Sequence, residues 1–157
     1  GMPVVTATTV KFTAGRRVAE QATDRVCQIL RHQAACRTAT TVLPGAPVGG
    51  VEGLLGEAKA KLEAKLDADV IEHLARSYGT DFARVLADAA PSLLTRVSED
   101  APVIAAQWVH AIREEMATSV EDLLARRTEL GARGLADAAL RERAEEILAA
   151  HSAEVRS

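Results

Sequence analysis

Apolar residues recur every three or four positions along most of the chain from residue 51 onward, the spacing of amphipathic helices. Each predicted helix carries one apolar stripe, flanked by charged residues. The stripes, in chain order, are Leu55, Ala58, Leu62 and Leu66; Val70, Ile71, Leu74 and Tyr78; Phe82, Val85, Leu86 and Ala89; Ile104, Trp108, Ile112 and Met116; and Leu140, Ala144, Ile147 and Leu148. The pattern predicts an all-α region of short helices.

Helix-ending and helix-starting residues separate these stripes. Gly79 is expected to end one helix as a C-terminal cap, and Thr80 to begin the next as an N-cap. Pro91 stops that helix, because the residue before a proline disfavours the helical conformation. Asp100 is then predicted to cap a helix that has Pro102 in its first turn.

The segment from Arg113 to Thr128 predicts a helix end, a capped turn and a new helix. Thr118 and Glu121 have the spacing of a capping box, and Arg126 and Arg127 end the new helix. A final helix is expected over residues 135–150.

The first residues have a different pattern. Residues 4–12 are rich in β-branched side chains and predict a strand, which Thr13-Ala14-Gly15 connects to a helix over residues 16–33. A single strand cannot pair its own backbone groups. It therefore pairs with a sheet outside this sequence, pairs with a second copy, or frays.

Turn-forming residues without apolar periodicity fill the next stretch, which is interpreted as a linker. The predicted organisation is a strand–turn–helix unit over residues 1–36, a linker over 37–50 and an all-helical domain over 51–157. The fold class is all-α, with an irregular, orthogonal multi-helix arrangement after the short N-terminal unit.

Composition narrows the function. The 157 residues are 48% hydrophobic and only 3% aromatic, which favours close-packed aliphatic helices. A net charge of −3 argues against nucleic acid or anionic lipid as a partner. No apolar run approaches the ~20 residues that span a bilayer, and no signal peptide is evident, so a cytoplasmic location is expected. Cys27 and Cys36 are interpreted as two reduced thiols.

Catalytic and metal constellations are not evident. His73 and His110 lack further ligands at metal spacing, and Ser77 near His73 lacks an orienting acid. Glu114 and Glu115 are adjacent, so they point about 100° apart on a helix and cannot share a proton as a dyad. These residues predict no independent active site.

Four motifs resemble one family. They are TVKFTAGRRVAE at residues 9–20, HLARSYGT at 73–80, EEMA at 114–117 and EDLLARRT at 121–128. In this order they resemble the last flavin-proximal strand, loop and helix, and then the helical C-terminal cap domain, of FAD-dependent glycerol-3-phosphate dehydrogenases.

The resemblance implies oxidation of sn-glycerol 3-phosphate to dihydroxyacetone phosphate, with hydride transfer to FAD and electrons passed to quinone, or to oxygen in oxidases. The Gly-x-Gly-x-x-Gly loop that would bind the dinucleotide does not occur here. The chain is therefore expected to be a C-terminal fragment, inactive alone and without bound cofactor, with the missing FAD and substrate domains as its partners. The parent would be cytoplasmic or peripheral on the inner face of the membrane. A homo-oligomer is also possible, and the alternative function is a free-standing helical protein-interaction module from a truncated gene.

Residue roles follow from the same resemblance. Lys11 and Thr13 would lie near the flavin in a full-length enzyme, where a helix N-terminus also favours negative charge. The cap-domain residues with expected structural roles are Tyr78, Gly79, Thr80, Glu115, Asp122, Arg126 and Arg127. The two arginines are expected to pair with nearby carboxylates, with phosphate binding as the alternative.

Overall fold

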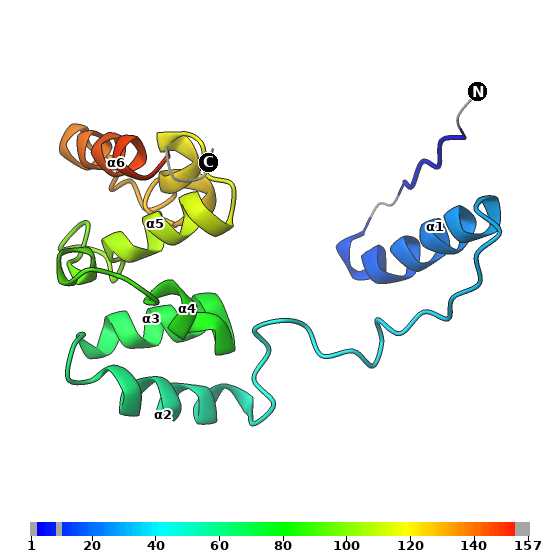
Figure 1. Ribbon diagram of the computed structural model, residues 1–157, viewed down its shortest axis with the longest axis horizontal. Helices are drawn as coiled ribbons and strands as arrows, with labels where there is room; N and C mark the ends of the chain where they lie inside the picture. The colour runs from blue at the N-terminus through cyan, green and yellow to red at the C-terminus, as the bar shows by residue number, and fades with distance from the viewer. Residues whose placement is uncertain (1–2, 9–10, 153–157) are drawn as a thin grey trace. The chain divides into compact units, whose positions relative to one another are not determined.

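The computed structural model describes residues 3–8 and 11–152, and every regular element among them is helical (Figure 1). The chain divides into two compact units, Gly1–Leu43 and Pro44–Ser157. This boundary falls inside the segment 37–50. The described residues contain no strand, only an isolated antiparallel bridge between Arg96 and Ile104.

Unit 1 contains a short 3-10 helix, η1 (Phe12–Ala14), followed by α1 (Gly15–Ile29). The predicted strand is not found: residues 3–8 and Lys11 are irregular, and residues 9–10 lie outside the described residues. Its absence has a simple cause, because no partner strand in the described chain can pair with its backbone.

Helix α1 also ends four residues before the predicted end at residue 33. Arg31 adopts the left-handed conformation, with φ of 53°. The N–H of His32 then donates to the carbonyl of Cys27 at 2.9 Å, and that of Arg31 to Gln28 at 3.2 Å. This pair of bonds is a Schellman motif, which closes a helix without glycine here.

Unit 2 contains the remaining helices, which are short; a tight turn joins α2 to α3, and longer connections containing η3 and η4 lead into and out of α5 (Figure 1). Helices α2 and α3 pack against each other, and α5 packs against α6. In chain order the elements are α2 (Gly50–Leu62), α3 (Ala68–Tyr78), η2 (Gly79–Asp81), α4 (Phe82–Val85), η3 (Pro91–Leu94), α5 (Ala105–Glu114), the π-helix η4 (Asp122–Arg127) and α6 (Ala138–His151).

The core of unit 2 has two apolar clusters that share α5. Trp108 and Ile112 pack with Leu123 and Leu124 of η4 in one cluster, while Ala106 joins α2, α3 and α4 in the other. Burying apolar surface on both sides of one helix stabilises the unit by about 25 cal/mol per Å². Helix α5 is therefore the central element.

Several predicted boundaries are wrong, each for a local reason. Helix α5 begins at Ala105 and not near Asp100, because Val97 N–H donates to the Val103 carbonyl at 2.9 Å and closes a loop between them. Met116 is not in the core; it follows the end of α5 and its side chain is 83% exposed.

The ends of the other helices agree in part with the predicted capping residues. Gly79 ends α3, with φ of 58° and ψ of −138°. Thr80 does not cap the next helix; it lies within η2, and its N–H donates to the Gly45 carbonyl at 3.0 Å. Helix α6 starts at Ala138, where Asp137 accepts a hydrogen bond from Leu140 N–H at 2.8 Å.

Candidate functional site

The residues of three sequence motifs meet at one hollow of unit 2, called here the arginine hollow. Its lining comes from the end of α3, from α5, from the turn after α5 and from η4. The lining residues are Ser77, Tyr78, Gln107, Glu115, Met116, Arg126 and Arg127. These segments are distant in sequence, so only the packing of α3, α5 and η4 brings them together.

Asp122 organises the turn that leads to the arginines. Its Oδ2 accepts hydrogen bonds from the N–H groups of Thr118 and Ser119, both at 3.0 Å, and from the Ser119 hydroxyl at 2.8 Å. Its Oδ1 accepts from Arg126 Nη1 at 2.7 Å. The hydrogen bond from the Thr118 backbone, followed by those from Ser119 and Arg126, holds the pKa of Asp122 far below its usual value. The expected Thr118–Glu121 capping box does not form. A box forms one position later, because Asp122 N–H donates to the Ser119 hydroxyl at 3.1 Å and the Asp122 carboxylate accepts from Ser119 N–H.

The π-helical turn decides where the two arginines lie. Leu123 and Leu124 are adjacent and both buried, so η4 turns two successive side chains into the core. Thr128 closes the turn, with its hydroxyl donating to the Leu123 carbonyl, and Gly131 N–H donates to the Leu124 carbonyl at 2.8 Å. Such π-helical turns occur frequently at functional sites.

Glu115 holds the second arginine. Arg127 Nη2 donates to the Glu115 carbonyl at 2.6 Å, and Arg127 Nε lies 3.7 Å from Glu115 Oε2. His110 Nε2 lies 3.8 Å from Glu115 Oε1. Both arginines are therefore paired with carboxylates from nearby turns.

Gln107 forms the floor of the hollow. Its Oε1 accepts from Ile104 N–H at 3.1 Å, which fixes the orientation of the amide. Its Nε2 then donates to His73 Nε2 at 3.2 Å and makes a long contact of 3.5 Å with the Tyr78 hydroxyl. Because Gln107 is almost fully buried, these contacts satisfy polar groups that would otherwise be costly.

This arrangement sets the ionisation of two neighbours. Burial lowers the pKa of His73, and His73 must be neutral to accept from the Gln107 amide. Burial likewise raises the pKa of Tyr78, whose ring lies edge-on to His110 at 5.6 Å. Both groups are therefore neutral at physiological pH.

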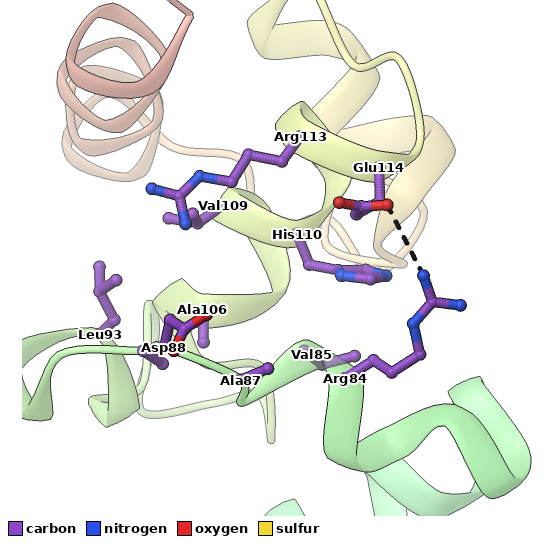
Figure 2. Close-up of a pocket in the computed structure, with 11 residues that line it drawn as sticks. Arg84, Val85, Ala87, Asp88, Leu93, Ala106, Val109, His110, Arg113 and Glu114 are labelled. Atoms are coloured by element: carbon purple, nitrogen blue, oxygen red, sulfur yellow. Dashed lines mark ion pairs between the residues drawn. The ribbon is translucent and has the colours of Figure 1, made fainter. Parts of the chain in front are cut away.

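A second hollow lies between α5 and α4 (Figure 2). Arg84 and Glu114 form an ion pair across it, with 3.7 Å between Arg84 Nη2 and Glu114 Oε2. Glu114 thus faces one hollow and Glu115 the other. The two carboxylates do not form a pair, in agreement with their adjacency in the sequence.

The two predicted flavin-proximal residues lie in unit 1. Lys11 precedes η1, and Thr13 lies within η1, directly before α1. Both are exposed. Unit 1 also has a hollow between α1 and residues 34–43, where Cys27 and Cys36 are free thiols.

Sequence reasoning missed Gln107 as a site residue. The available signal was a polar residue between Ile104 and Trp108 in a strongly apolar helix. Within the described part of the chain, no cluster of three or more His, Cys, Asp or Glu side chains is placed to hold a metal ion. No helix there is long and apolar enough to cross a bilayer.

Comparison with known proteins identifies the class of domain. Residues 36–155 match the family model of the C-terminal domain of alpha-glycerophosphate oxidase. Since this match covers more than half of the chain, the chain belongs to that family. The motifs at residues 73–80, 114–117 and 121–128 all lie within the matched range, and the resemblance based on them is confirmed.

A curated relative agrees with this assignment. A glycerol-3-phosphate dehydrogenase from Synechocystis sp. is 37% identical to this chain over 121 residues. The aligned region covers 75% of this chain but 22% of the relative. The chain therefore spans about a fifth of the length of the relative that it matches.

Proposed function

We propose that this chain is the C-terminal part of a flavoprotein that oxidises sn-glycerol 3-phosphate, and that it contributes structure and not catalytic groups. The observation that carries the proposal is the exposure of the apolar side of α1. This helix has a well-segregated apolar side, yet none of its residues is buried. An amphipathic helix of this kind is stable when its apolar side packs against another surface.

The apolar side of α1 is the proposed contact with the catalytic body. Val26 and Ile29 are 41% and 37% exposed, and Leu30 beyond the helix is 70% exposed. Covering such side chains stabilises an assembly by about 25 cal/mol for each Å² of apolar surface removed from water. The occupant that fits is the FAD domain of the same protein, because the aligned region is 22% of the matched relative and the rest of that relative lies outside it.

The start of α1 fits a position beside a flavin. η1 continues directly into α1, so the helical segment begins at Phe12. Lys11 provides no side-chain cap there, and the first turns of η1 and α1 contain no acidic residue. Free N–H groups at a helix N-terminus favour a nearby negative charge, such as that of a reduced flavin ring. In the assembled protein Lys11 and Thr13 would be next to the cofactor, and hydride transfer to FAD would be supplied by the other domains.

Unit 2 would then act as the cap domain of the assembly. Its own residues offer packing and ion pairs: Gly79 ends α3, Asp122 caps the turn before η4, and Arg126 and Arg127 pair with carboxylates. The proposal assigns these residues to the stability and surface of the cap.

A chimera tests the proposal. The aligned C-terminal region of the Synechocystis relative would be replaced by this chain, and the product assayed for retained FAD and for dye reduction by sn-glycerol 3-phosphate. We expect the chimera to keep flavin and activity that are lost when the region is simply deleted. The isolated chain should neither retain stoichiometric FAD nor oxidise the substrate.

Two α1 variants sharpen the test. Val26→Glu should reduce flavin retention in the chimera while leaving the circular dichroism of the isolated chain unchanged. Gln21→Glu, at an exposed polar position of the same helix, is the control and should have no effect. Equal activity of the chimera and the deletion variant would contradict the proposal and favour a free-standing interaction module.

A further inference from the structure

We propose that the arginine hollow binds an acidic polypeptide segment. An Asp or Glu side chain of the partner would bind Arg126 and Arg127, and an adjacent apolar side chain would cover Met116 and the ring of Tyr78. These four residues come from three separate segments and line one hollow of unit 2. The proposal concerns only this hollow and does not depend on the flavoprotein assignment.

The guanidinium groups have unused donor capacity. Arg126 bonds to Asp122 through Nη1 alone, and its side chain is 61% exposed. Arg127 contacts Glu115 through Nη2 and Nε. Among the described residues no partner is found for Nε and Nη2 of Arg126 or for Nη1 of Arg127. A carboxylate can accept from several such groups at once, and charge-assisted bonds of this kind are strong.

The arginines are also held in place before any ligand binds. Asp122 positions Arg126 from the same turn, and Glu115 positions Arg127 through its backbone and side chain. Held side chains lose less conformational entropy when they bind a partner. Two arginines and one glutamate line the hollow, and Asp122, which pairs with Arg126, is not among the lining residues.

Met116 is the second, independent sign of a binding surface. Its φ of 58° is unfavourable for a residue with a side chain, and glycine is the usual residue at this position after a helix. Met116 is 83% exposed, so packing within unit 2 compensates little for this strain. A strained backbone that carries an exposed apolar side chain at the rim of a hollow points to a contact outside the chain.

Tyr78 supplies the remaining polar and apolar surface. Its hydroxyl oxygen accepts a long hydrogen bond of 3.5 Å from Gln107 Nε2. The hydroxyl proton has no acceptor among the described residues. The edge-on contact with His110 fixes the ring. Tyrosine, arginine and methionine are the residue types enriched at the centres of protein interfaces.

A polypeptide fits this surface better than the other anionic partners do. A small oxyanion would reach the arginines but leave Met116 uncovered. Nucleic acid would require an extended basic surface, whereas the basic side chains that line this hollow are Arg126 and Arg127. An acidic segment with a neighbouring apolar side chain matches both the unused donors of the two arginines and the exposed methionine.

An NMR titration of the ¹⁵N-labelled full chain tests the proposal. The probe is a peptide with capped ends and the central sequence Gly-Leu-Glu-Leu-Gly. We expect saturable shifts confined to the residues that line the hollow. Replacing the peptide glutamate by glutamine should weaken binding about tenfold, because charge-assisted hydrogen bonds are lost.

Variants of the chain separate binding from folding. Arg126→Gln should weaken peptide binding about tenfold, while the matched Arg76→Gln should change it less than about twofold. Arg76 is a suitable control because it also pairs with the acidic residue four positions earlier, at 2.7 Å, and does not line the hollow. Met116→Gly should weaken binding and raise the unfolding midpoint, an outcome that a purely structural methionine would not give.

Three results would overturn the proposal. One is the absence of saturable shifts, and another is a set of shifts located away from the hollow. The third is binding of inorganic phosphate in the hollow as tightly as the glutamate peptide, which would make it a small-oxyanion site. A well-dispersed amide spectrum for each variant shows that loss of binding is not loss of fold.

Discussion

A Cβ atom on Gly79 would overlap the carbonyl oxygen of Gly45. The same oxygen accepts the hydrogen bond from Thr80 N–H at 3.0 Å. The backbone that enters unit 2 is therefore pressed directly against the end of α3, at a place where no side chain fits. The motif glycine at position 79 has two reasons to be glycine, its backbone conformation and this close contact.

Gly79→Ala should consequently destabilise unit 2 strongly. The added methyl group forces the Gly45 segment away and strains a backbone conformation that suits only glycine, so we expect a loss of about 3 kcal/mol or more. Urea unfolding followed by circular dichroism measures the loss. Gly56→Ala is the control: it lies within α2 with open space around it, and should stabilise the helix by up to about 1 kcal/mol.

Substitutions of two adjacent acids test the assignment of the cap. Asp122→Asn should lower the urea midpoint, because the amide cannot match the hydrogen bonds of the carboxylate to Thr118, Ser119 and Arg126. Glu121→Gln should have little effect, since Glu121 makes only an exposed ion pair with Arg141. The reverse ranking would show that the predicted capping box forms in solution.

The same carboxylate predicts a response to acid. The pKa of Asp122 in the folded chain is below its ordinary value of 3.8, so ionised Asp122 stabilises the fold. This contribution is complete above pH ~4 and is lost as the pH falls through the lowered pKa. Urea midpoints measured from pH 6 to 2 should therefore fall less in Asp122→Asn than in the unmodified chain.

His73 predicts a pH dependence at higher pH. Burial lowers its pKa in the folded chain, with Glu129 acting in the opposite direction, so the unfolded chain takes up the proton first. Stability should fall as the pH drops from about 6.5 to the lowered pKa, and this part of the dependence should level off below that pKa. His73→Gln should remove the effect, whereas His32→Gln in unit 1 should retain it. An identical pH dependence in His73→Gln would show that His73 is not the group responsible.

Met116→Gly should stabilise the chain. Removing the side chain from a residue with positive φ relieves roughly 1 kcal/mol of backbone strain and costs no buried contact. Met116→Ala keeps the unfavourable φ and should stay within about 0.5 kcal/mol of the original. Thermal unfolding of both variants gives the comparison, and a destabilised Met116→Gly would indicate an unrecognised packing role.

The helical core could be predicted because its signal is local. Leu74, Trp108 and Leu140 each belong to an apolar stripe with helical spacing on a different helix, and all three are buried. Helix ends were harder. Gly79 was identified because glycine marks a C-terminal cap, but Arg31 and Met116 end their helices with positive φ and carry no glycine signal.

The candidate site was only partly predictable for a different reason. The resemblance singled out Tyr78, Glu115, Arg126 and Arg127 as separate motif residues, without indicating that they line one hollow. Gln107 was not identified at all, because a single glutamine in an apolar stripe has the same appearance whether it is buried or exposed. Its role depends on His73 and Tyr78, which lie about thirty positions earlier in the chain.

The all-α class, most positions of the apolar stripes and the resemblance to FAD-dependent glycerol-3-phosphate dehydrogenases could be predicted from the amino-acid sequence alone, because they depend on local periodicity and on short motifs. The three-dimensional structure was needed to show that residues 3–8 and Lys11 form no strand, that Asp122 and not Glu121 takes part in the cap of its turn, and that two arginines share a hollow with an exposed methionine. Each of these outcomes depends on which groups meet across elements, where pairing, burial and backbone strain are settled by packing and not by neighbours in the chain.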